Sequence, residues 1–243
     1  MIFFCNKNSQ CATTLEEWQQ LFPGKNGKFV KNRSAKEMAK FWLNKGKQEE
    51  IFDSISNICN SGDIETCYPE HETRFDNYGE GRNHDLLLIS DRKSVIITIE
   101  GKADEPFGSS YFYDEIIKAV LKIKNNVNTS MFDRSIDLYN QYYLRNKEVL
   151  KLRYQLVHWF AGTLTEAEQH KSDKMIMIVQ EFISTGLDQK KLKRNEDDFA
   201  EFIAFISLGR FKTISNREMR GPINNKYTRE KDLYIMKYQE YLS

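Results

Sequence analysis

The sequence predicts an α/β fold in which helices flank a small mixed β-sheet. Two short apolar runs, HDLLLIS and SVIITIE, are separated by a few polar residues and are typical of a β-hairpin. A third run, MIMIVQEF at 175–182, is apolar throughout, as expected of a strand buried on both faces. Segments with helical spacing of apolar residues precede, separate and follow these runs, which favours packed layers of helices and sheet.

Two helices and a strand are expected before the hairpin. The first helix begins near Thr14 and ends at Pro23-Gly24. Ser34, with Glu37 three residues later, has the pattern of a capping box at the start of the second helix. The polar segment that follows contains a predicted strand at 65–73.

The second half of the chain alternates helices with the buried strand. Helical spacing predicts helices at about 111–124 and 147–170, and another that starts with Asn195 as its cap and ends at Gly209. The basic stretch before Asn195 is expected to be a loop. We predict one domain over 1–209 and a basic extension over 210–243, with a last helix near 229–241.

Composition limits the classes of function. The chain has 243 residues, is 40% hydrophobic and 29% charged, and carries a net charge of +1, so a nucleic-acid surface would have to be local. No apolar run is long enough to cross a bilayer, and the first residues lack the pattern of a signal peptide, so no membrane partner is expected. The four cysteines form no Cys-x-x-Cys pair. They are expected to be reduced thiols in a cytoplasmic protein.

The hairpin brings charged residues together at its open end. With a turn at 91–94, Ser90 faces Val95, and the same register places Asp85 opposite Glu100. Because side chains alternate along a strand, Glu100 and Lys102 share one face, and the register predicts that Asp85 joins them.

Two neighbouring carboxylates repel each other unless a cation lies between them. A hard divalent ion such as Mg²⁺, or Mn²⁺ in its place, binds one or two carboxylates and keeps several waters. A lysine beside such an ion orients water or stabilises a developing phosphoryl anion. The alternative to a metal site is that Asp85, Glu100 and Lys102 lie at the solvated edge of the sheet and form only a weak surface ion pair.

A resemblance to a known superfamily favours the metal site. Asp85, followed by an apolar hairpin that ends in Glu100-Gly101-Lys102, is similar to the signature of the PD-(D/E)XK, restriction-endonuclease-like nucleases. The segments WQQLF, SAKEMAKFW, YPEHE, IEGKADEPFG and LRYQLVHWFAGTLTEAEQ resemble an uncharacterised bacterial family placed in that superfamily. The similarity runs from about Thr14 to Ile206. Asn83-His84-Asp85 stands where the superfamily's name has Pro-Asp.

The resemblance implies a restriction-endonuclease-like core and roles for individual residues. Asp85 and Glu100 would bind Mg²⁺, and Lys102 would contact the attacking water or the scissile phosphate. Glu70 in YPEHE is the candidate for a further acidic ligand, with a solvated strand edge as its alternative. Asp104 is expected in the loop that follows, within reach of Lys102.

Three further features have two interpretations each. Arg153 falls within the apolar stripe of the predicted helix at 147–170, so it either forms a structural ion pair or contacts a phosphate or an acidic ligand. His71 is a candidate to support a metal ligand or an ordinary polar residue. Clusters of Lys and Arg at 118–124, 190–194 and 210–220 would suit a phosphate backbone, or are solvated faces.

The leading hypothesis is a Mg²⁺-dependent nuclease that acts on DNA or RNA. The alternative is a catalytically inactive, nuclease-like binding module with a nucleic-acid partner. A hydrolase with a Cys or Ser nucleophile is disfavoured, because the sequence contains no nucleophile elbow. A homodimer is compatible with either hypothesis.

Overall fold

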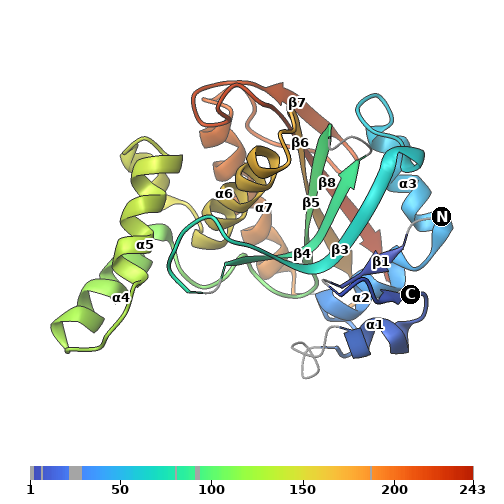
Figure 1. Ribbon diagram of the computed structural model, residues 1–243, viewed down its shortest axis with the longest axis horizontal. Helices are drawn as coiled ribbons and strands as arrows, with labels where there is room; N and C mark the ends of the chain where they lie inside the picture. Colours follow the sequence, from blue (N-terminus) through green and yellow to red (C-terminus); the bar gives the residue numbers. More distant parts are fainter. Residues whose placement is uncertain are drawn as a thin grey trace.

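An eight-stranded mixed sheet forms the centre of the protein (Figure 1). The computed structural model describes residues 3–6, 8–21, 29–79, 81–90, 94–186 and 188–242. The strand order is β2-β1-β3-β4-β5-β6-β8-β7. The strands are β1 (Phe4–Cys5), β2 (Cys11–Ala12), β3 (Ile64–Thr73), β4 (Arg82–Ser90), β5 (Val95–Lys102), β6 (Lys174–Ile183), β7 (Met219–Ile223) and β8 (Asp232–Tyr241).

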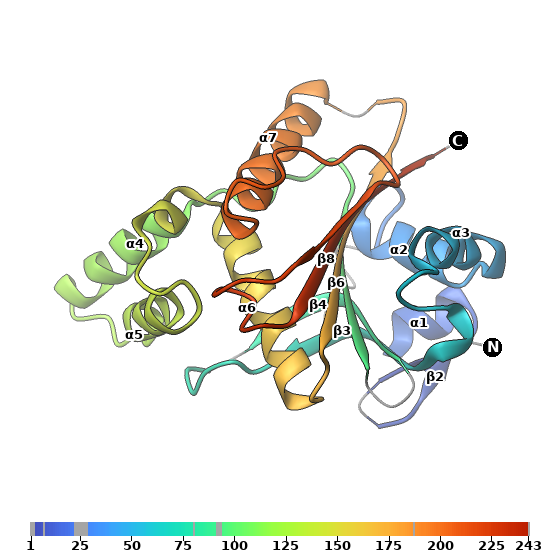
Figure 2. The ribbon, with the colours of Figure 1, turned by 90° about the horizontal axis from the view of Figure 1, so that it is seen from above.

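Helices cover both faces of this sheet. Figure 2 shows α6 and α7 on one face and α1 to α3 on the other, with α4 and α5 beyond α6. The α-helices are α1 (Leu15–Leu21), α2 (Ser34–Trp42), α3 (Lys45–Ile55), α4 (Phe112–Lys124), α5 (Met131–Asp137), α6 (Tyr154–Gln169) and α7 (Gln189–Ile206). Shorter helical turns are η2 (Ser61–Asp63), the π-helical η4 (Leu138–Tyr142) and η5 (Lys147–Lys151).

The centre of the sheet contains the predicted hairpin, the strand expected at 65–73 and the buried strand, although the sheet is larger than the small one expected. Strands β3, β4 and β5 form an antiparallel meander, and β6 pairs in parallel with β5 after the chain crosses over through α4 to α6. Leu86 faces Ile99 and Ile89 faces Ile96, which confirms the predicted hairpin register. The tip of its turn, at 91–93, lies outside the described residues, as does the expected helix end at Pro23-Gly24.

The alternation of side chains divides the core into two layers. Leu86, Leu88 and Ile97 pack with the residues of α1 to α3. Leu87 and Ile96 pack on the other face, with α6 and α7. Because the central strands are buried on both faces, they are apolar at nearly every position, which explains why the sequence identifies them so clearly.

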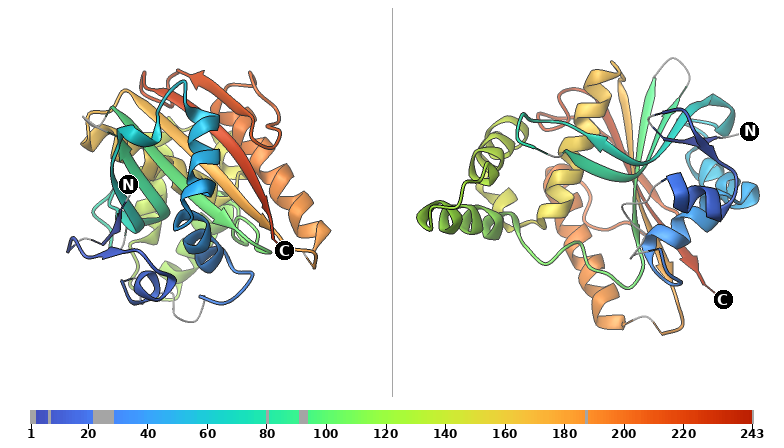
Figure 3. Two further views of the ribbon diagram at one scale, coloured as in Figure 1. Left: turned by 90° about the vertical axis from the view of Figure 1, so that its right-hand side faces the viewer. Right: turned by 60° about the horizontal axis from the view of Figure 1, so that its bottom comes forward.

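The end of the chain differs from the prediction. The expected helix at 229–241 is wrong, because Asp232–Tyr241 is strand β8, paired in parallel with β6, and β7 pairs antiparallel with β8 (Figure 3). Leu233 and Ile235 enter one core layer and Met236 enters the other. A strand buried on both faces lacks the alternation that distinguishes it from a buried helix.

Three boundaries also differ. The predicted helix at 147–170 is divided into the 3₁₀ turn η5 and helix α6. The predicted basic loop is the first half of α7, and Asn195 lies inside that helix, where its side chain donates to the carbonyl of Glu105. Ser34 forms no capping box with Glu37; its hydroxyl donates instead to Glu105.

The cysteine prediction is wrong for one pair. Cys5 and Cys11 form a disulfide, whereas Cys59 and Cys67 are free and buried. Burial raises the pKa of the Cys59 thiol to about 12. Because disulfides are typical of oxidising compartments, the pair weakens the argument for a cytoplasmic location. Over the described part of the chain, every helix is too short or too polar to cross a membrane.

Candidate active site at the end of strand β5

Glu100 and Lys102 lie at the carboxyl end of β5, between β4 and β6. By strand alternation both share the face of Thr98. Thr98 accepts a hydrogen bond from the indole N–H of Trp159, a residue of α6, at 3.1 Å. The common orientation of Glu100 and Lys102 is therefore confirmed, and both side chains point towards α6.

Side chains that hold the carboxylate of Glu100 include Lys102, Gln155 and Arg82, and Glu100 is only 2% exposed. Lys102 Nζ donates to Oε1 at 2.9 Å, and the side-chain amide of Gln155 donates to the same oxygen. The guanidinium of Arg82 donates to Oε2. Burying a carboxylate requires such partners, because an unpaired charge away from water is strongly destabilising.

Gln155 connects both charged residues, a role that sequence reasoning missed. Its amide donates to Glu100, and its Oε1 accepts a hydrogen bond from Lys102 Nζ at 3.3 Å. In a regular helix that starts at 147, Gln155 would lie about 200° around the axis from Arg153, on the side away from the apolar stripe. Helix α6 instead begins at Tyr154 and is buried around most of its circumference, so its first turn faces the end of β5. The sequence signal for this role was the position of Gln155 in RYQL, at the start of the helix that packs on the sheet.

Asp85 reaches the same edge of the sheet but lies on the other side. Its Oδ2 accepts a hydrogen bond from the backbone N–H of Gly101 at 2.8 Å. A Cβ atom built on Gly101 would lie 3.5 Å from this oxygen and 2.7 Å from Cγ of Met38, a residue of α2. Because Gly101 faces away from Glu100 and Lys102, the expectation that Asp85 shares their face is wrong.

A break in the alternation of β4 explains this position. His84 lies against Gly162 of α6, whereas Leu86, two residues later, belongs to the core layer under α1 to α3. Regular alternation would place both on one face. The β3–β4 ladder pairs Pro69 with Leu86 and His71 with His84 and omits the pair between them, where Glu70 has a φ of 54°.

Glu70 and His71 are therefore separated from the Glu100 network by β4. Both line a cavity of about 260 Å³ at the outer side of β3. His71 Nε2 lies 3.1 Å from Oε1 of Glu166, and His170 Nε2 lies 3.3 Å from Oε2 of the same residue. Burial raises the pKa of the Glu166 carboxyl, but its hydrogen bonds from His71 and Thr73 outweigh that effect and the pKa is lowered overall. His71 thus belongs to a second polar cluster.

Arg153 is buried and paired with a carboxylate, as predicted, but its partner is not a residue of the site. Its Nε donates to Oδ2 of Asp198, on α7, at 2.7 Å. Its guanidinium carbon lies 3.8 Å from the ring centre of Tyr111. Arg153 precedes α6 as its N-cap instead of lying within a helical stripe. The structural interpretation of Arg153 is the one that the geometry supports.

Asp104 lies in the loop after β5 and pairs with a lysine of α7. It accepts a hydrogen bond from Nζ of Lys191, on α7, at 3.2 Å. Lys102, Asp104 and Lys191 line one narrow cavity together with Glu181 of β6. Glu181 forms an ion pair of 3.2 Å with Lys237 of β8. Charged residues thus continue from β5 across the carboxyl ends of the two adjacent parallel strands.

A buried histidine of β4, His84, lies near Arg82. His84 is fully buried, and neither ring nitrogen has a hydrogen-bond partner among the described residues. Burial, together with the charge of Arg82, lowers the pKa of His84 well below its ordinary value. Arg82 therefore supplies positive charge near Glu100, whereas His84 supplies none.

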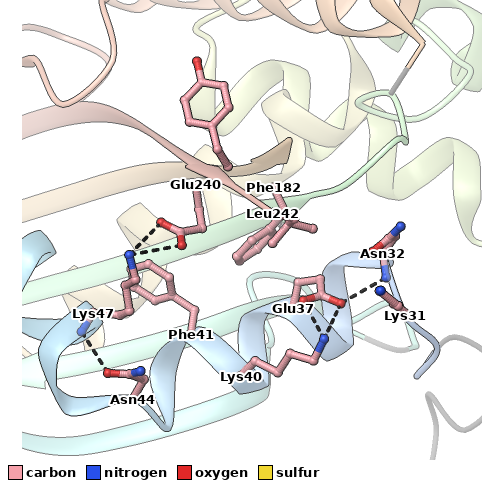
Figure 4. Close-up of a pocket in the computed structure, with 11 residues that line it drawn as sticks. Lys31, Asn32, Glu37, Lys40, Phe41, Asn44, Lys47, Phe182, Glu240 and Leu242 are labelled. Carbon is pink, nitrogen blue, oxygen red and sulfur yellow. Dashed lines mark hydrogen bonds and ion pairs between the residues drawn. The ribbon is translucent and has the colours of Figure 1, made fainter. Parts of the chain in front are cut away.

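A second pocket, of about 250 Å³, opens at the same edge of the sheet on the α2 side (Figure 4). Its lysines are largely paired: Lys40 Nζ lies 2.9 Å from Glu37, and Lys47 Nζ lies 3.2 Å from Glu240. Such pairing leaves this pocket with little net charge for an anionic ligand.

The basic clusters are also extensively paired. Lys191 bonds Asp104, Lys193 bonds Asp197 at 2.8 Å, and Arg217 bonds Glu50 at 2.8 Å. These contacts favour the interpretation of solvated, charge-balanced faces for much of the basic surface.

The donors for a metal ion are few. In the described part of the chain, no three His, Cys, Asp or Glu side chains are arranged to hold a metal. Asp85 and Glu100 are carboxylates at neighbouring strand ends but on opposite faces of the sheet, and two carboxylates are as many as Mg²⁺ commonly uses.

Comparison with known families covers nearly the whole chain. A family described as "Domain of unknown function (DUF6946)" matches residues 11–241. The chain belongs to the DUF6946 family. The match extends through β7 and β8, so this family includes the end of the chain that was expected to be an extension. No curated protein and no solved structure matches the chain.

Proposed function

We propose that this DUF6946 protein is a divalent-metal-dependent phosphodiester hydrolase that acts on nucleic acid, DNA or RNA. The observation that carries the proposal is the buried network of Glu100, Lys102 and Gln155 at the carboxyl end of β5, with Asp85 at the adjacent strand end. Strand ends next to a crossover helix are common positions for catalytic residues in α/β proteins, since loops leave the edge accessible.

The connectivity of the sheet supports the proposal. Helix α2, the meander β3–β5, helix α6 and the parallel strand β6 follow the order expected of a restriction-endonuclease-like core. The residues that resemble the PD-(D/E)XK signature lie on the hairpin β4–β5. We therefore propose membership of that superfamily as the origin of the arrangement.

The donor chemistry of the site fits a hard divalent ion only if two contacts change, because Asp85 accepts the Gly101 N–H on the face opposite Glu100, and Arg82 donates to Glu100. Asp85 and Glu100 offer the carboxylate oxygens that Mg²⁺ or Mn²⁺ prefers. Arg82, however, donates to Oε2 of Glu100, and its positive charge opposes a cation on the same oxygen. Binding of an ion by Glu100 therefore requires Arg82 to turn away from Oε2.

Each residue of the proposed site would have a separate role in hydrolysis. A bound ion would act as a Lewis acid and lower the pKa of a water molecule. Lys102, held 2.9 Å from Glu100, would place a positive charge beside the phosphoryl group, where negative charge develops. Gln155 would keep Lys102 and Glu100 at a fixed separation. Asp85 would supply the second carboxylate ligand once its Oδ2 leaves the Gly101 N–H.

A nuclease-like binding module is the second candidate, and two specific observations favour it. Arg82 neutralises Glu100, and the Asp85 carboxylate lies on the Met38 side of Gly101. An arrangement fixed in this form would bind a phosphate backbone through Arg82 and Lys102 without cleaving it.

One experiment separates the two candidates. The protein is incubated with labelled single- and double-stranded DNA and RNA, with Mg²⁺, Mn²⁺ or EDTA, and both cleavage and binding are measured. The hydrolase predicts cleavage that requires the divalent ion. Binding without cleavage under every condition would reject the hydrolase and leave the binding module.

A further inference from the structure

Helix α4 carries large apolar side chains on a face that is open to solvent. The exposed fraction is 39% for Ile117 and 55% for Tyr113. Four nearby side chains have exposed fractions between these two: Val120, Leu121, Ile123 and Val127. A contiguous group of this size is unusual on a monomer, and such patches commonly mark interaction sites.

Three of the exposed residues form a stripe that is separate from the buried face of the helix. At 3.6 residues per turn, Tyr113, Ile117 and Val120 lie within about 60° of one another around the helix axis. The two buried residues of α4, Phe112 and Ala119, point about 120° away from this stripe. One face of α4 therefore packs on the protein while a second apolar face remains exposed.

The position of α4 makes this face accessible. Figures 1 and 2 show α4 and α5 projecting as an arm beyond α6, away from the sheet. A partner that docks on the outer face of α4 would therefore approach from the far side of the arm and leave the end of β5 open.

The charges of α4 match a reversed copy of the same helix. Acidic Asp114 lies in the first turn and basic Lys124 in the last. Lys124 is exposed and has no ion pair among the described residues, although it falls within the apolar stripe. In an antiparallel pair symmetric about residue 119, Ile117 meets Leu121 of the second copy and Asp114 meets Lys124 of the second copy. The same register therefore brings apolar side chains into contact with apolar side chains and places an acidic side chain beside a basic one.

We propose that the protein forms a homodimer in which α4 packs antiparallel against α4 of a second copy across a two-fold axis. Such an interface is self-complementary, since each contact occurs twice. The opposed helix dipoles favour the antiparallel orientation. The proposal is independent of the hydrolase.

The mass in solution tests the dimer. Light scattering coupled to size exclusion should give twice 28.7 kDa for the native sequence. Leu121→Asp places a charge in the contact and should weaken dimerisation on the order of a hundredfold. Leu208→Asp is the matched control, since Leu208 is 57% exposed and Leu121 is 51% exposed. Circular dichroism should show that both variants are folded. A native monomer, or equal masses for the two variants, would overturn the proposal.

Cross-linking tests the orientation. Val120 is one residue from the symmetry point, so Val120→Cys should form a disulfide between two copies under mild oxidation. Tyr113→Cys should not, because six residues from the symmetry point place its two copies about 18 Å apart along the axis. Equal cross-linking of both variants would indicate parallel helices and overturn the antiparallel dimer. Binding of a monomer to lipid vesicles would likewise overturn it, since the occupant of the stripe would then be a membrane surface.

Discussion

The side-chain amide of Gln155 donates a hydrogen bond to the carboxylate of Glu100, and this contact joins the first turn of α6 to the end of β5. The same amide accepts a hydrogen bond from Lys102. The two charged residues of the site are therefore positioned by a neutral residue from another element, which makes the site sensitive to the placement of α6.

Gln155→Ala should lower the cleavage rate about 10- to 100-fold, as is typical when a residue that orients a metal-site ligand is lost. Its loss of hydrogen bonds should destabilise the protein by about 1 kcal/mol. Single-turnover rates and urea unfolding measure the two effects. Gln169→Ala, at the exposed end of the same helix, is the control and should change neither. An unaltered rate for Gln155→Ala would remove this residue from the site.

Arg82→Ala should tighten the binding of Mn²⁺, because it removes the cation that contacts Oε2 of Glu100. It should also lower the free energy of unfolding by about 1–3 kcal/mol, since the buried Glu100 loses a charged partner. Calorimetric titration with Mn²⁺ and urea unfolding test both changes. If the variant is less stable and its affinity for Mn²⁺ is the same as that of the native sequence, Arg82 does not compete with the ion.

Arg153→Leu should destabilise the protein by about 3–5 kcal/mol, because it leaves Asp198 buried without its main cation. The cleavage rate per folded molecule should stay the same, since Arg153 contacts Asp198 and Tyr111 instead of Glu100. Lys193→Ala, on the exposed side of α7, is the control and should change stability by less than about 0.5 kcal/mol. A lower rate with unchanged stability would restore Arg153 to the site.

His84 should make stability depend on pH. Burial holds its folded-state pKa well below the ordinary value, so below about pH 6.5 the unfolded chain binds a proton that the folded protein does not. Stability should therefore fall as the pH decreases, by up to about 1.4 kcal/mol per pH unit for this group. His84→Gln removes the titrating group, and unfolding measured at pH 8 and pH 5.5 should then show a smaller difference than in the native sequence. An equal difference in both proteins would show that another group controls acid sensitivity.

The sequence predicted those parts of the fold in which local pattern and tertiary environment agree. The hairpin β4–β5 and strand β6 are continuous apolar runs, and the register that pairs Leu86 with Ile99 follows from the length of the turn. Strand β8 was mistaken for a helix, because a strand buried on both faces has no alternating pattern.

The candidate site was predicted only where the local pattern of side chains is regular. Glu100 and Lys102 share a face because alternation along β5 is regular. The position of Asp85 could not be predicted, because it depends on the break in β4 between His84 and Leu86. Gln155 could not be placed, because a helix that is buried on most sides has no solvent face from which to set its phase.

Asp85→Asn and Lys102→Ala should separate metal binding from turnover. An amide is a poorer ligand than a carboxylate for a hard dication, so Asp85→Asn should weaken Mn²⁺ binding. Lys102→Ala should bind Mn²⁺ nearly as the native sequence does and cleave more slowly, because the lysine acts on the transition state. Calorimetric titration and single-turnover rates measure the two properties. Loss of Mn²⁺ binding in Lys102→Ala, or unchanged binding in Asp85→Asn, would contradict the assigned roles.

The most direct test of the proposed hydrolase is the cleavage rate of the native sequence and of Glu100→Gln, measured on the same nucleic acid with saturating Mn²⁺. Glu100 is the residue to which Lys102, Gln155 and Arg82 all bond. If Glu100 is the central ligand, the native sequence should cleave in a metal-dependent way and Glu100→Gln should lose at least about a hundredfold in rate. Equal rates for the two proteins, or no cleavage by either, would contradict the proposed hydrolase.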